Sequence, residues 1–131
     1  MLDAIDTVTR LLRTMPQIRI ATVFGSIASG RAGAESDLDI AVATDRPLSS
    51  ANKIDLIERL ATALGRPVDM IDLLSAQGPV LQQALARGRL IKCEDRALYA
   101  RLLLRMLYNQ ADDMRYRRCV LEQRQRAWTQ T

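Results

Sequence analysis

The chain has 131 residues, of which 48% are hydrophobic and 26% charged, and its formal net charge is +4. This size and composition fit one globular domain over residues 1–131 and exclude a disordered or fibrous protein. Histidine is absent, which excludes Ser-His-Asp and Cys-His triads and histidine-ligated zinc sites. We therefore expect chemistry based on carboxylates, hydroxyls, backbone amides, arginines and added metal.

The first half of the chain predicts one helix and two strands. Apolar residues recur at helical spacing over 2–15, and Pro16 ends this helix. Residues 18–24 are rich in β-branched side chains, which is typical of a strand. A loop with three glycines follows, and 37–43 then predicts a second, largely buried strand.

A second helix is predicted after the second strand. Ser49 or Ser50 can cap its start, it runs to about Leu64, and Gly65 then supplies a C-terminal stop. Its apolar residues at helical spacing predict the buried face. That face comprises Ile54, Ile57, Leu60, Ala61 and Leu64.

The remaining elements are a strand over 68–74, a helix over about 79–87, a short strand over 89–93 and a long helix over 94–126. Asn109 and Asp112-Asp113 could kink the long helix. The predicted fold class is therefore α/β (α+β), with a small mixed β-sheet of about four strands packed by helices. The core covers about 1–93, and the long basic C-terminal helix follows.

The net charge is concentrated in the C-terminal helix. Residues 1–95 hold 11 Lys/Arg and 12 Asp/Glu, a net −1, whereas residues 96–131 hold 8 Arg and 3 acids, a net +5. A basic segment of this kind is a solvated face, a partner-docking helix or a nucleic-acid binding element. No recognisable nucleic-acid binding motif accompanies it, so direct nucleic-acid binding is not expected.

Paired carboxylates at the start of the second strand carry the clearest chemical signal. Asp37 and Asp39 are two positions apart, so their side chains project from one face about 6.5 Å apart along the strand. Such a pair needs a cation or a proton, and an all-oxygen site suits Mg²⁺ or Mn²⁺. Two ions of this kind are a known device for nucleotidyl transfer.

A third carboxylate for such a site comes from the strand over 68–74. Asp69 and Asp72 are three positions apart, so they point to opposite faces of the strand and only one can join the site. We favour Asp69, which lies near the start of the strand between Val68 and Met70. Asp72 is then expected to face a loop or to support the site indirectly.

The Gly-Ser pair after the first strand fits a phosphate-binding loop. Gly25 lets the backbone approach a phosphate closely, and Ser26 offers a hydroxyl and an amide. Gly30 and Gly33 keep the connecting loop compact. Each piece alone is common, but the glycine, the serine and the three acids in this order at strand ends form a specific pattern.

These stretches, GSIASGRAGAESDLDIAV followed by RPVDMIDL, resemble the minimal nucleotidyltransferase domain of the polymerase-β superfamily. The resemblance implies Asp37 and Asp39 as metal ligands and Asp69 as the third carboxylate. It further implies that the nucleotide triphosphate is held by the Gly-Ser loop and the residues after it. The expected nucleotide-binding residues are Gly25, Ser26, Gly30, Arg31 and Ser36.

The sequence departs from many members of the superfamily at one point. They carry an arginine at the position of Ser29, whereas here the arginine comes at Arg31. Whether Arg31 replaces that contact is open at this stage.

Within the superfamily, the chain is most similar to the MntA-type antitoxins paired with HEPN ribonuclease toxins. This resemblance implies an adenylyltransferase that uses ATP and two Mg²⁺ to place AMP on a tyrosine of a helical toxin. The helix over 94–126 is the candidate contact in a hetero-oligomer with that toxin. Two alternatives stay open: a non-catalytic antitoxin acting by occlusion, and a small nucleotidyltransferase acting on a small molecule or an RNA end.

The sequence also bears on location. No stretch approaches the roughly 18 apolar residues of a membrane span. Cys93 and Cys119 lie far apart in the sequence and outside any CxxC pair, which favours free thiols. We therefore expect a cytoplasmic protein without a membrane partner.

Overall fold

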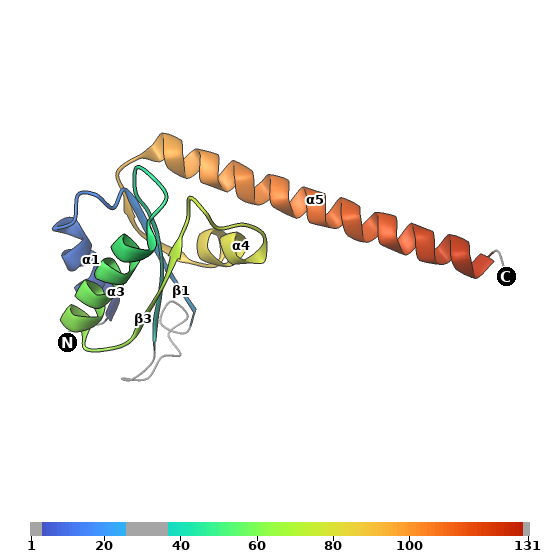
Figure 1. Cartoon of the computed structure of the whole chain (residues 1–131). Helices are drawn as coiled ribbons and strands as arrows, with labels where there is room; N and C mark the ends of the chain where they lie inside the picture. The colour runs from blue at the N-terminus through green and yellow to red at the C-terminus, as the bar shows by residue number, and fades with distance from the viewer. Residues whose placement is uncertain (1–3, 26–36, 130–131) are drawn as a thin grey trace.

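A four-stranded sheet forms the centre of the computed structural model, which describes residues 4–25 and 37–129 (Figure 1). The strand order is β3-β2-β1-β4. Strand β1 pairs antiparallel with both β2 and β4, and β2 pairs parallel with β3. The predicted mixed sheet of about four strands is therefore confirmed. The bounds are β1 Ile20–Phe24, β2 Leu38–Ala43, β3 Val68–Asp72 and β4 Arg89–Cys93.

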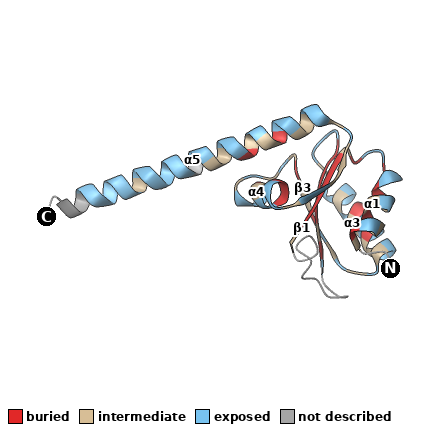
Figure 2. Cartoon of the chain, turned by 180° about the vertical axis from the view of Figure 1, so that it is seen from behind, coloured by how far each residue is buried: buried red, intermediate tan, exposed pale blue. Residues whose placement is uncertain are grey.

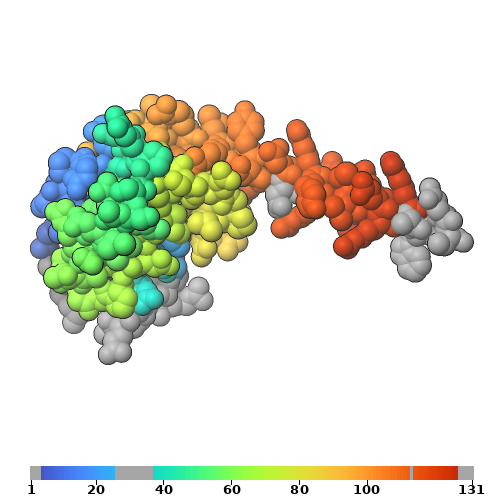
Figure 3. Space-filling view, viewed as in Figure 1, coloured from blue at the N-terminus to red at the C-terminus, as the bar shows by residue number. Residues whose placement is uncertain are grey.

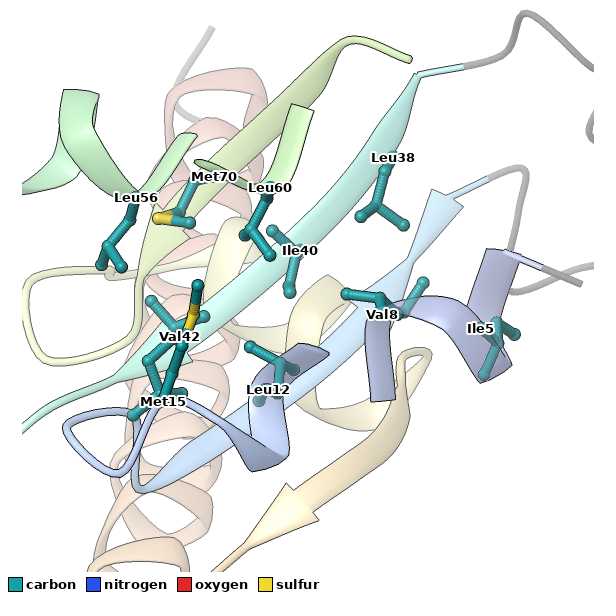
Figure 4. Packing of buried hydrophobic residues seen from close by; sticks show 13 residues of the cluster. Ile5, Val8, Leu12, Met15, Leu38, Ile40, Val42, Leu56, Leu60 and Met70 are labelled. Atoms are coloured by element: carbon teal, nitrogen blue, oxygen red, sulfur yellow. The ribbon is translucent and has the colours of Figure 1, made fainter. Parts of the chain in front are cut away.

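Helices cover both faces of this sheet. Helices α1 (Ala4–Arg13) and α3 (Ser50–Leu64) lie on one face (Figure 4), whereas α4 (Pro79–Ala86) and the start of α5 (Arg96–Thr129) lie on the other. Alternate residues of each strand supply the two cores, because successive side chains point to opposite faces. In β2, Leu38, Ile40 and Val42 pack toward α1 and α3, and Ala41 and Ala43 pack toward α4 and α5.

Capping residues determine where helix α3 begins and ends. Ser49 is its N-cap and accepts a hydrogen bond from the Asn52 amide at 3.1 Å, and Gly65 ends it with φ 66°. Both termini agree with the prediction. Leu60 is buried as predicted, but the predicted face is wrong at Ile54, which is 56% exposed, because Leu56 takes the buried position in the first half of the helix.

Two boundaries differ from the prediction because aspartate side chains set them. Strand β3 ends at Asp72, two residues early, since the Asp72 carboxylate accepts hydrogen bonds from the Leu74 amide and the Ser75 hydroxyl and closes a turn. Helix α5 begins at Arg96 rather than at residue 94, because Asp95 accepts from the Leu98 amide as an N-cap residue does.

Helix α5 extends far beyond the sheet (Figures 1 and 3). Its 34 residues continue as α-helix through Asn109 and Asp112, so no break occurs where a kink was expected. Among its described side chains only Leu102 and Met106 are buried, and both lie in its first third (Figure 2). In the part of the chain that the structure describes, no helix is long and apolar enough to cross a membrane.

Candidate active site

Two of the three predicted carboxylates are register partners in the sheet. Asp39, the second residue of β2, lies directly beside Asp69 of β3 in the parallel ladder. Neighbouring strands are about 4.8 Å apart, and in-register side chains share a face. That face is the one toward α4 and α5, because Asp39 alternates with Leu38 and Ile40, which pack on the opposite face. Asp37 immediately precedes β2 and is exposed.

The charges of these carboxylates act on Asp39. Partial burial raises the pKa of Asp39 above its usual value, and the nearby charges of Asp69 and Asp37 raise it further. Ionisation of Asp39 is therefore less favourable than that of an isolated aspartate, and a nearby cation would offset this difference. The donors are all carboxylate oxygens, which are the ligands that Mg²⁺ and Mn²⁺ prefer, so these residues fit a divalent cation.

The carboxylates do not form a closed ligand cage. Within residues 4–25 and 37–129, no three acidic or cysteine side chains are gathered as closely as a bound metal ion requires. The described acids thus form an open edge, and the groups completing a coordination shell would come from elsewhere, such as phosphate oxygens or water.

Gly25 lies against this edge, directly after β1. Its neighbour Phe24 is the register partner of Asp39. Gly25 has φ 75°, and a Cβ added there would overlap the Asp39 carboxylate. Both the backbone conformation and the space therefore require glycine. The sequence pattern predicts that Gly25 approaches a phosphate, but it does not predict the contact of Gly25 with Asp39.

Asp72 occupies a different environment, although it is on the same strand as Asp69. Its carboxylate accepts hydrogen bonds from the Leu48 amide at 2.8 Å, the Leu74 amide at 3.0 Å and the Ser75 hydroxyl at 3.1 Å. It therefore holds two loops together on the α1 and α3 side of the sheet. The structure places Asp69, and not Asp72, beside Asp39.

Arg105 of α5 positions the segment that follows β3, a role that the sequence analysis missed. Its guanidinium donates hydrogen bonds to the backbone carbonyls of Leu73, Leu74 and Ala76, the last two at 3.1 and 2.9 Å. These contacts join residues about 30 positions apart in the sequence. The one available signal was an arginine between the buried Leu102 and Met106 on an otherwise apolar helix face.

The remaining predicted site residues lie outside the described part of the chain. They are Ser26, Gly30, Arg31 and Ser36, together with the departure at Ser29.

A mixed sheet with aspartates on adjacent strands beside a glycine fits a nucleotidyltransferase, and comparison with protein families shows that class. The profile of the family described as "Polymerase beta, Nucleotidyltransferase" matches residues 6–97. The chain belongs to this family.

One curated relative within this family is a protein adenylyltransferase. The chain is 35% identical over 85 residues to the protein adenylyltransferase MntA of Shewanella oneidensis. That match covers 64% of this chain and 61% of the relative, so the chain spans less than two thirds of the length of that relative.

Solved structures resemble the whole fold. A toxin-antitoxin structure with AMP-PNP aligns with a TM-score of 0.70 and 27% identity, covering 89% of this chain and 98% of the other. A complex of a tri-AMPylated Shewanella oneidensis HEPN toxin with an MNT antitoxin aligns with a TM-score of 0.65 and 25% identity, covering 90% and 96%.

Proposed function

We propose that this chain is an antitoxin nucleotidyltransferase that transfers AMP from ATP onto a tyrosine of a HEPN ribonuclease toxin. The observation that carries the proposal is the pairing of Asp39 with Asp69 behind Gly25. Family membership supports the reaction class. The MntA relative and the tri-AMPylated toxin complex support AMP as the transferred group and a HEPN protein as the acceptor.

In this proposal the carboxylates of Asp37, Asp39 and Asp69 hold two Mg²⁺, with Mn²⁺ as a substitute. The bound ions would neutralise charge on the triphosphate and lower the pKa of the acceptor hydroxyl. The raised pKa of Asp39 supports this assignment, because partial burial and then the charges of Asp69 and Asp37 make its ionised form less favourable, and a cation would offset both effects.

The nucleotide would lie along the Gly-Ser loop. Gly25 leaves room for the Asp39 carboxylate to lie against the backbone at the end of β1. Ser26, Gly30, Arg31 and Ser36 are proposed to bind the triphosphate, with Arg31 in place of the arginine absent at Ser29. The tyrosine oxygen forms a bond to the α-phosphorus while the bond to pyrophosphate breaks, and the phenolic proton passes to water at this open edge.

The acceptor is proposed to come from another molecule, in a hetero-oligomer with the toxin. The likeness to a complex of a tri-AMPylated HEPN toxin with an MNT antitoxin supports an acceptor on a partner protein. Cys93 and Cys119 are free thiols, which is typical of the reducing cytoplasm, the proposed location.

The test is mass spectrometry of the cognate HEPN toxin after incubation with this chain, ATP and Mg²⁺. We expect one or more added AMP units, lost with Asp39→Asn or a chelator and kept with Asp45→Asn, an exposed acid in the loop after β2. An unmodified toxin that is nevertheless neutralised would favour the occlusion alternative. Added AMP on RNA or a small molecule, with the toxin unmodified, would favour a small nucleotidyltransferase that acts on such a substrate.

ATP binding can be measured without the toxin. A ligand that binds only the folded chain must raise its melting temperature. We expect ATP with Mg²⁺ to stabilise the wild-type chain and not the Asp39→Asn variant.

A further inference from the structure

Helix α5 carries an apolar stripe on the part that leaves the sheet. Four large side chains on it are 53–65% exposed, and they are separated by three, seven and seven residues. With Ala111 and Arg118 between them they occupy the a and d positions of three successive heptads. We name this stripe the α5 seam. It comprises Leu104, Leu107, Ala111, Met114, Arg118 and Leu121.

Exposing the apolar side chains of the α5 seam to water is unfavourable in free energy for an isolated chain. Single exposed apolar residues are normal, but these are aligned on one side of one helix. The helix beyond Met106 has no buried side chain among its described residues (Figures 2 and 3). Most of the stability of a helix in a protein comes from tertiary packing of one face, and the described residues of this part of α5 show no such packing. A heptad stripe is stabilised by packing against another helix, which indicates the shape of the missing partner.

The charges around the α5 seam indicate which kind of helix can pack against it. Arg118 is exposed within the seam. Its exposed flanks carry three basic residues and one acid, namely Arg115, Arg117, Arg124 and Glu122, so their net charge is positive. The seam itself contains no acid. A second copy of this chain would bring two Arg118 side chains and two arginine-rich flanks together, with Glu122 as the one acid among the described flank residues of each copy, so positive charge would remain unbalanced. A helix with acidic flanks and one carboxylate opposite Arg118 would satisfy these charges.

The base of α5 is joined to the sheet at the end of β3 that lies away from Asp69. Arg105 binds three backbone carbonyls directly after β3, the strand that carries Asp69. A protein held along the seam would consequently have a fixed position relative to the carboxylates.

We propose that the α5 seam docks one amphipathic helix of another protein, with an apolar heptad stripe, acidic flanks and a carboxylate facing Arg118. The inference rests on the proposed function to the extent that this protein is the toxin that receives AMP. The docking itself requires no chemistry and can be tested separately.

The test uses the full chain and a synthetic helix of four heptads with leucine at a and d, glutamate at the flanks and one glutamate in the stripe. We expect binding by fluorescence anisotropy, weakened at least tenfold by Met114→Glu or Leu121→Glu. Tyr116→Glu is the matched control, since Tyr116 is 70% exposed on the other side of the helix. It should change the affinity less than twofold.

Three results would overturn the proposal. The first is no binding of the acidic helix, and the second is equal loss with Tyr116→Glu. The third is a dimer of the wild-type chain in sedimentation equilibrium that Met114→Glu dissociates, which would make a second copy the occupant. Stabilisation by ATP with Mg²⁺ is measured on every variant. If it persists while docking fails, the docking surface is wrong and the nucleotide site is not.

Discussion

Strand β3 carries two aspartates, three residues apart, whose surroundings differ in kind. Asp72 accepts three hydrogen bonds and holds two loops in place. Asp69 lies beside Asp39 on the opposite face and raises the pKa of that neighbour. A carboxylate satisfied by donors stabilises a fold, whereas carboxylates gathered against one another destabilise it until a cation binds. The comparison separates the acid that supports the structure from the acids that form the candidate site.

The largest expected effect is on AMP transfer. Asp69→Asn and Asp39→Asn remove charge that the proposed reaction needs at the triphosphate, so the initial rate should fall by at least about 100-fold. Asp72→Asn keeps the shape of the side chain and should leave the rate of the folded protein within a few fold. Transfer of radiolabelled AMP to the toxin measures all three. Equal losses at Asp69 and Asp72 would break the distinction between the two acids.

A substitution at Gly25 tests the contact between this glycine and the Asp39 carboxylate. Gly25→Ala should reduce transfer more than tenfold, because the new methyl group overlaps the Asp39 carboxylate. Gly65→Ala is the matched control, since Gly65 has nearly the same φ, 66° against 75°, but open space around it. The control should cost about 1 kcal/mol of stability and leave the rate unchanged. Equal rates for the two variants would show that the contact with Asp39 is unimportant.

For stability, in contrast to AMP transfer, the larger effect is expected at Asp72 and not at Asp69. Asp72→Ala removes three hydrogen bonds from a half-buried carboxylate and should lower the free energy of unfolding by about 2 kcal/mol. Asp69→Ala, measured in a chelator, should not lower it, because it relieves repulsion at Asp39. Urea denaturation gives both values. A stability loss at Asp69 as large as that at Asp72 would mean that Asp69 has a structural role.

The two aspartates also show what sequence alone could predict. Alternation along β3 placed them on opposite faces, and the strand start favoured Asp69, because both arguments depend only on neighbouring residues. The hydrogen bond from the Leu48 amide to Asp72 and the contacts of Arg105 were not predictable, since each joins segments more than 20 residues apart. The prediction that Ile54 is buried was wrong for the same reason. The periodicity of the helix allowed two adjacent buried faces, and packing against the sheet determines which of them is buried.

The smallest effect is a dependence of stability on pH. The folded chain raises the pKa of Asp39 above its value in the unfolded chain, so it binds that proton more tightly. The resulting stabilisation is complete below about pH 4, the ordinary aspartate pKa, and is lost as pH rises through the raised value. In a chelator at pH 7, Asp39→Asn should therefore melt slightly above the wild type, and the difference should shrink as the pH falls toward 4. Added Mg²⁺ should stabilise the wild type and reverse the order at pH 7. A variant that never exceeds the wild type in chelator would show that the charge of Asp39 costs the fold nothing, and the contrast with Asp72 would then depend on hydrogen bonds alone.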